Sequence, residues 1–76
     1  MKINRYNGKT VHIVFDATEC RSAELADFID HESQGRIEPI EIRYHVPTQI
    51  NTIICRCSNA QQAELERLLQ TVCSAD

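Results

Sequence analysis

Alternating apolar and polar residues predict four strands, at residues 2–6, 9–15, 36–46 and 50–57. Asn7-Gly8 separates the first two strands. Because Asn-Gly suits a type I′ turn, which needs positive φ at both central residues, we expect a β-hairpin there. Pro39 interrupts the third strand and cannot donate a backbone hydrogen bond. This strand should therefore lie at an edge of the sheet or be bulged at Pro39.

Apolar residues at helical spacing predict two helices. The first, residues 18–33, starts with either Asp16 or Thr18 as its cap and ends near Gly35. The second, residues 59–73, follows Ser58-x-x-Gln61, which has the form of a capping box. Its apolar stripe contains Leu65, Leu68, Leu69, Val72 and Cys73.

The predicted order is β-β-α-β-β-α, or β-α-β-β-α if the first strand is weak. Two helices with one apolar stripe each should cover the same face of the sheet, so the fold class is a two-layer α+β sandwich with a mainly antiparallel sheet. The 76 residues allow one small domain, spanning residues 1–76. The expected core contains Val11, Ile13, Phe15, Leu25, Phe28, Ile29, Ile42, Leu65, Leu68 and Leu69.

The composition narrows the classes of partner. The net charge of −3 and the pI near 5.5 argue against nonspecific binding to nucleic acid or membranes, because both are anionic. No apolar run approaches the length of about 18 residues that a membrane span needs. Residues 1–5 lack the apolar stretch of a signal peptide, so we expect a cytoplasmic protein.

The negative charge is concentrated in residues 16–41, which carry eight acidic residues against Arg21 and Arg36. On the first helix Glu24, Asp27 and His31 share an arc opposite the apolar residues, and Asp30 lies nearby. Three interpretations compete: a solvated face, a surface for a basic partner, and a metal site formed by Cys20, Glu24, Asp27 and His31. The metal site is the weakest of the three, because it mixes hard and soft ligands on an exposed helix.

Four cysteines, Cys20, Cys55, Cys57 and Cys73, raise the question of disulfides or metal binding. In a cytoplasmic protein we expect them to be reduced and to pack as small apolar residues. Cys55-Arg56-Cys57 is not the C-x-x-C motif of redox or zinc sites. We therefore expect no metal and no cofactor.

No catalytic motif is visible. The serines lack the G-x-S-x-G context, and two glycines are too few for a phosphate-binding loop. His12 and His45 should lie on the outer face of the sheet with Arg43 and Arg56, where a polar, solvent-facing surface is the simplest interpretation. We expect a protein that is not an enzyme and has no catalytic residues.

The second half of the chain carries a family pattern. It contains Glu41-Ile42-Arg43-Tyr44, then a short strand Ile50-Asn51-Thr52-Ile53-Ile54, then the leucine-rich helix from Ala63 to Val72, which runs into Ser74-Ala75-Asp76. This sequence resembles the DinI-like family of damage-inducible and phage proteins. The residue-level similarity covers residues 36–76.

The resemblance implies a regulator that acts by protein contact, since members of this family bind the RecA recombinase filament in the SOS response through an acidic last helix. Carried over to this chain, it places Glu64, Glu66 and Asp76 on the contact surface, whereas the charge pattern points to Glu24, Asp27 and Asp30. The predicted function is a non-enzymatic protein-binding regulator without direct contact to nucleic acid. The alternatives are a small phage-type inhibitor of another nucleic-acid-handling complex, or a metal- or redox-responsive protein that uses Cys55, Cys57 and Cys73.

Overall fold

The computed structural model describes residues 1–73 and contains four strands and two α-helices. The strands are β1 (Lys2–Arg5), β2 (Thr10–Asp16), β3 (Glu38–His45) and β4 (Ile50–Arg56). The helices are α1 (Ser22–Glu32) and α2 (Gln62–Cys73), and a 3-10 turn at Asn59–Gln61 precedes α2. The predicted β-β-α-β-β-α order is confirmed, because β1 is paired in the sheet.

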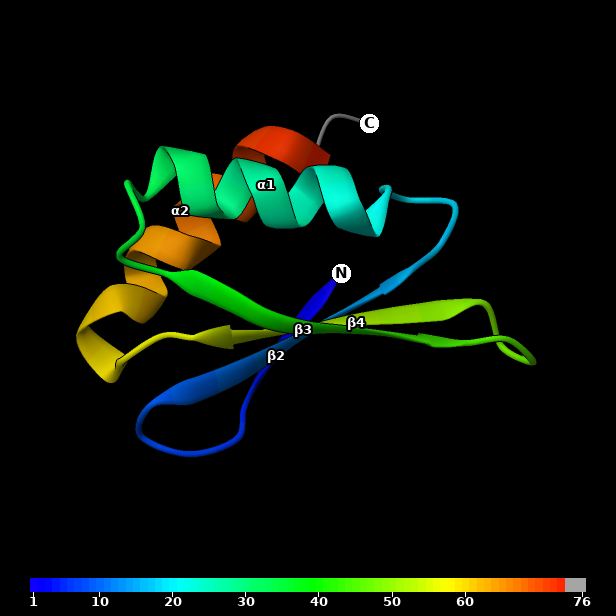
Figure 1. Ribbon diagram of the computed structural model, residues 1–76, viewed down its shortest axis with the longest axis horizontal. Coiled ribbons are helices and arrows are strands. Elements are labelled where there is room, and N and C mark those ends of the chain that lie inside the picture. Colours follow the sequence, from blue (N-terminus) through cyan, green and yellow to red (C-terminus); the bar gives the residue numbers. More distant parts are fainter. Residues whose placement is uncertain (74–76) are drawn as a thin grey trace.

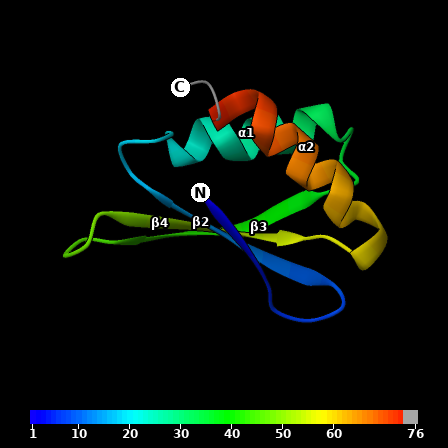
Figure 2. The ribbon, with the colours of Figure 1, turned by 180° about the vertical axis from the view of Figure 1, so that it is seen from behind.

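The strands form one antiparallel sheet in the order β1-β2-β4-β3. Both helices lie on one face of this sheet, and in the described part of the chain the opposite face is left open (Figure 1; Figure 2). The structure is therefore the predicted two-layer α+β sandwich.

The core lies between the helices and the two central strands. Alternate residues of β2 and β4 face the helices, and directly opposed pairs such as Ile13 and Ile53 lie at its centre. The predicted core residues that are buried are Val11, Ile13, Phe15, Leu25, Ile29, Leu65 and Leu69. They are joined by Ile37, Ile53, Cys55 and Cys57, which are fully buried.

Three residues of the expected core are more exposed than predicted. Ile42 is 45% exposed, and Phe28 and Leu68 are only partly buried. Ile42 lies directly opposite Ile53 and therefore on the helix-facing side of the sheet. Because β3 is an outer strand, one flank of Ile42 is open to solvent. The alternation of apolar and polar residues predicts on which face of the sheet a side chain lies. The order of strands in the sheet decides how deeply that side chain is buried.

The predicted β1–β2 hairpin is confirmed, but its turn is not of type I′. Neither Asn7 nor Gly8 has a positive φ. Instead, the side-chain oxygen of Asn7 accepts a hydrogen bond from the backbone N–H of Lys9 at 2.8 Å, and the carbonyl of Thr10 accepts one from the N–H of Tyr6 at 3.0 Å. The side chain of Asn7 shapes this turn, as Asn side chains often do.

Helix α1 starts at Ser22 and not at residue 18. The carboxylate of Asp16 accepts hydrogen bonds from the backbone N–H of Thr18 at 2.9 Å and from its hydroxyl at 2.8 Å. These two bonds, the backbone one first, lower the pKa of Asp16. The two expected cap residues thus close a turn before the helix, and the N-cap residue, Arg21, makes no side-chain capping bond.

Other local predictions are confirmed. β3 is both an outer strand and irregular, with a register shift between Pro39 and Glu41. Ser58 and Gln61 form the predicted capping box before α2. Gly35 follows the end of α1 with a φ of 80°, a conformation that glycine adopts without strain.

Arg5 joins the first strand to the start of α2. Its Nε donates to the side-chain oxygen of Gln62 at 2.8 Å, and its two terminal nitrogens donate to the carbonyls of Cys57 at 3.0 Å and Ser58 at 3.1 Å. The sequence pattern did not predict this contact, because its partners are more than fifty residues apart along the chain.

Candidate protein-binding surface

The three acidic residues predicted on the first helix are all exposed. Glu24, Asp27 and Asp30 follow one another along α1. Arg21 makes only a long contact with Glu24, at 3.4 Å between two well-exposed side chains. Within residues 1–73 neither Asp27 nor Asp30 has a cation at ion-pair distance. The acidic face of α1 therefore keeps most of its charge.

The second cation of the acidic segment, Arg36, does not neutralise this face. Its guanidinium instead forms an ion pair with Glu64 of α2. Arg36 also accepts, through its backbone carbonyl, a hydrogen bond from Gln61 at 3.0 Å. This ion pair neutralises Glu64 of α2 and leaves the carboxylates of Asp27 and Asp30 on α1 without Arg36 as a partner.

Two shallow hollows flank the acidic face. One, of about 490 Å³, lies between α1 and β3; Ala26, Ile40 and Ile42 are among its apolar residues, and Asp27, Asp30, Glu38 and Glu41 are its acidic ones. The other, of about 400 Å³, has Phe28 among Glu24, Asp27, His31 and Glu32. Both combine apolar surface with carboxylates, which suits a partner that presents apolar and basic side chains together.

The acidic residues of the second helix do not join this surface. Glu64 is largely covered and paired with Arg36, while Glu66 is exposed and accepts a hydrogen bond from Gln62 at 3.2 Å. The two side chains are two residues apart on a helix and so point to different sides. Asp76, the third residue implied by the family resemblance, lies outside the described residues. Glu24, Asp27 and Asp30 thus line the hollows beside α1, whereas Glu64 and Glu66 line neither of them.

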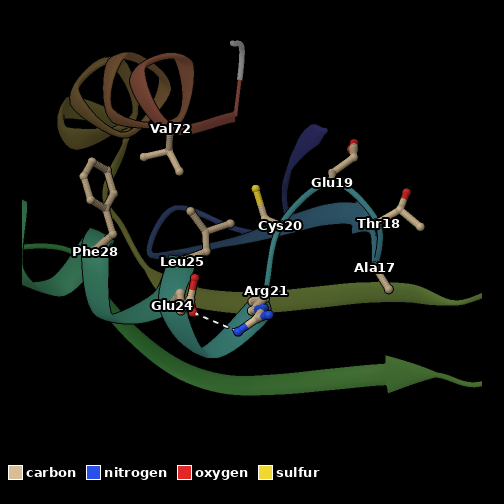
Figure 3. Close-up of a pocket in the computed structure, with 9 residues that line it drawn as sticks. All are labelled: Ala17, Thr18, Glu19, Cys20, Arg21, Glu24, Leu25, Phe28 and Val72. Atoms are coloured by element: carbon tan, nitrogen blue, oxygen red, sulfur yellow. Dashed lines mark hydrogen bonds and ion pairs between the residues drawn. The ribbon is translucent and has the colours of Figure 1, made fainter. Parts of the chain in front are cut away.

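A third hollow, of about 590 Å³, lies where the loop of residues 17–21 meets α1 and Val72 of α2 (Figure 3). Its polar residues include Thr18, Glu19 and Glu24. The hydroxyl of Thr18 donates to Asp16, and the sulfur of Cys20 is in a disulfide, so neither is presented as a free nucleophile. This hollow offers a binding surface and no recognisable catalytic arrangement among the described residues.

The disulfide at Cys20 corrects the prediction that all four cysteines are reduced. That prediction rested on the expected compartment, and spacing along the sequence does not reveal which sulfurs meet in space. It also removes Cys20 from the proposed metal site with Glu24, Asp27 and His31. Among the described side chains, those of residues 1–72, no group of three His, Cys, Asp or Glu is placed to hold a metal ion.

Cys55 and Cys57 are free and fully buried. Burial, together with a smaller contribution from the nearby Cys57, raises the pKa of Cys55 to about 12. Burial also raises the pKa of Cys57, although Arg5 opposes this shift. Thiols with raised pKa values are protonated near neutral pH and are poor nucleophiles and metal ligands. The side chain of Cys73 lies outside the described part of the structure.

We expect Cys55 and Cys57 to resist alkylation by iodoacetamide in the native protein, because both are buried and protonated. They should react in urea, where burial is lost. Peptide mass spectrometry after alkylation at pH 7.5 would locate each modified residue. Rapid native alkylation of either cysteine would contradict the buried placement and favour the redox alternative.

The outer face of the sheet carries mostly polar side chains, as predicted, with Ile54 buried among them. Tyr6 stacks on His12 with ring centroids 5.3 Å apart, and Nδ1 of His45 lies 2.8 Å from the hydroxyl of Thr48. Arg43 and Arg56 pair with Glu41 and Glu38 at 2.6 Å and 3.2 Å. The hydrogen bond from Arg43 lowers the pKa of Glu41. Paired charges make this face less strongly charged than α1.

None of the helices in the described residues is long and apolar enough to cross a bilayer.

Comparison with known proteins identifies no relative of this chain. No family model matches the chain, and no curated protein or solved structure matches it. The resemblance to the DinI-like family therefore stays a prediction, and the function must be inferred from the chain's own surface.

Proposed function

We propose that this protein is a non-enzymatic regulator that binds a basic surface of another protein through the acidic face of α1. Asp27 is the central residue, because it borders both the hollow against β3 and the hollow around Phe28. Glu24 and Asp30 extend the acidic face in the two directions along the helix.

The uncompensated charge of α1 is the observation that carries the proposal. Arg36 is held by Glu64, and Arg21 makes only a long contact with Glu24. Clustered charges of one sign steer a partner of opposite charge during encounter, and the apolar surface beside them can be buried once contact is made. A merely solvated face needs no apolar hollows within the acidic residues.

A RecA-like recombinase filament is the first partner to test, because the resemblance in residues 36–76 implies it. The surface differs from the one that the resemblance implies. In this chain the acidic field lies on α1, so we propose that α1 replaces the last helix as the contact. Another nucleic-acid-handling complex would offer the same basic chemistry and is the second partner to test.

Two charge reversals of equal size distinguish the helices. We expect Asp27→Lys/Asp30→Lys to weaken binding to a RecA filament assembled on single-stranded DNA on the order of tenfold or more at low salt. Glu64→Lys/Glu66→Lys should weaken it much less, because Glu64 is already neutralised by Arg36. Fluorescence anisotropy of the labelled protein at two salt concentrations measures both effects, with circular dichroism as the check on folding.

The outcomes separate the hypotheses. If only the α2 variant loses binding, the surface implied by the family is correct and the α1 proposal is wrong. If the parent protein does not bind the filament, the parent and the Asp27→Lys/Asp30→Lys variant are each used to capture proteins from a bacterial lysate, and the captured proteins are compared. Equal capture by parent and α1 variant would show that the acidic face is only solvated.

The metal- or redox-responsive alternative has less support. Cys55 and Cys57 are buried with raised pKa values, and neither borders the hollows beside α1. The phage-type inhibitor alternative differs from the proposal only in the identity of the partner.

A further inference from the structure

The outer strand β3 exposes apolar side chains along a free edge. Ile40, Ile42 and Tyr44 are 47%, 45% and 51% exposed. In the described part of the chain β3 pairs with β4 on one flank and with no strand on the other. An exposed apolar edge of this kind can pair with another strand, and proteins usually prevent this with charged residues, prolines, bulges or a covering segment. Here Glu41 and Arg43, in the regular part of the strand, form an ion pair with each other, and Glu38 pairs with Arg56 of β4.

The backbone groups that face the free edge belong to the apolar residues. The N–H of Cys57 donates to the carbonyl of Lys9 and the N–H of Ala17 donates to that of Gln49, so odd-numbered residues of β4 hydrogen-bond towards β2. By alternation, the even-numbered residues of β4 bond towards β3, where they pair with Glu41, Arg43 and His45. The remaining residues of β3, Ile42 and Tyr44, therefore turn their N–H and C=O groups outward.

We propose that this edge pairs with β3 of a second copy of the chain, antiparallel and centred on Ile42, to form a continuous eight-stranded sheet. In this register Ile42 lies opposite its counterpart and Glu41 lies opposite Arg43, while Tyr44 faces the irregular segment around Ile40. The apolar side chains of both copies then gather on the helix-facing side of the joined sheet. The charged side chains gather on the outer side.

Charge complementarity favours this register and a second copy of the chain as the pairing partner. Centring the pair on Glu41 or on Arg43 would place identical charges directly opposite each other, which destabilises strand pairing. Centring it on Ile42 makes two Glu41–Arg43 contacts and puts four charges of alternating sign on one face. These are non-hydrogen-bonded pairs, in which side chains lie closest. The segment Glu41–Arg43 is thus complementary to itself.

Two structural features limit the pairing to these residues. The irregularity between Pro39 and Glu41 ends regular strand geometry on one side, and Pro39 has no N–H to donate. On the other side the chain turns at residues 46–49, between β3 and β4. Asp27 and Asp30 of the two copies would both border the joined edge, and their repulsion is reduced near physiological salt, where the Debye length is about 8 Å.

Charge variants test the pairing directly. The parent should show concentration-dependent dimerisation by analytical ultracentrifugation in 150 mM salt, at concentrations up to about 1 mM because the interface is small. Glu41→Arg and Arg43→Glu should each weaken dimerisation about tenfold or more, since each makes two like-charge contacts. An equimolar mixture of the two variants should dimerise again, because each then faces the opposite charge.

A cysteine variant tests the centre of the register. Counterparts at position 42 should have Cα atoms about 5.5 Å apart, within the range for a disulfide. Ile42→Cys should therefore cross-link between copies on mild oxidation. Arg43→Cys should not, because each position 43 faces position 41 of the other copy.

The proposal is overturned if the parent stays monomeric over the whole concentration range, or if it dimerises but mixing the charge variants does not restore the dimer. Cross-linking of Arg43→Cys in preference to Ile42→Cys would also overturn it. These outcomes leave the proposed function untouched, because oligomeric state is measured without any partner of α1.

Discussion

Replacing Ile53 by alanine should destabilise the fold by about 2–5 kcal/mol, whereas replacing Ile42 by alanine should cost about 1 kcal/mol or less. The two isoleucines lie directly opposite each other on β4 and β3, on the same face of the sheet. Ile53 is fully buried, so its truncation leaves a cavity in the core. Ile42 is nearly half exposed, so water fills the space that its side chain leaves.

Urea unfolding followed by circular dichroism measures both free energies, at a low protein concentration where association is negligible. A domain of this size has a margin of stability comparable with the expected cost, so Ile53→Ala is a variant that can fail to fold. Ile53→Val then serves as the measured variant, with an expected cost of about 0.5–1.5 kcal/mol. Equal costs for Ile42→Ala and Ile53→Ala would show that β3 is not an outer strand.

Replacing Ser33 by alanine should destabilise the protein by about 1–3 kcal/mol, although the change removes a single oxygen atom. Ser33 is fully buried at the end of α1. Its hydroxyl accepts a hydrogen bond from the N–H of Ile37 at 3.1 Å and lies 3.3 Å from the carbonyls of Asp30 and Ile37. The substitution leaves the N–H of Ile37 without this acceptor in a site that excludes water.

Ser22→Ala is the matched control, because it removes the same atom from a partly exposed site at the start of α1. We expect its free energy of unfolding to stay within about 0.5 kcal/mol of the parent value. Thermal or urea unfolding of both variants gives the comparison. Equal effects at the two serines would contradict the role given to the Ser33 hydroxyl.

The sequence predicted the elements and their layers because these depend on local periodicity. Val11, Ile13 and Phe15 alternate as a half-buried strand must, and Leu65 and Leu69 lie one helical turn apart. It predicted from Pro39 that the third strand lies at an edge or is bulged, but not the full order of strands, which depends on how hairpins pair at long range. This is why Ile42 was assigned to the core, while Ile37, which follows the end of α1, was not recognised there.

The candidate site was predicted in part. Glu24, Asp27 and Asp30 share one helix, so their common exposure followed from helical spacing alone. The pairing of Arg36 with Glu64 could not be predicted, because it depends on where α2 lies over the sheet. The disulfide at Cys20 was missed for the same reason, since it depends on proximity in space.

The strand order also determines how the chain can fold. β1–β2 and β3–β4 are neighbours in both sequence and space, so each hairpin can form locally, whereas β2 and β4 meet only when a loop that contains α1 has closed. Closing a loop costs chain entropy before any contact compensates for it. We therefore expect the joining of the two hairpins to be the slow event in folding. Side chains where β2 meets β4, such as Ile13 and Ile53, should then control the folding rate, and those of the outer strands mainly the unfolding rate.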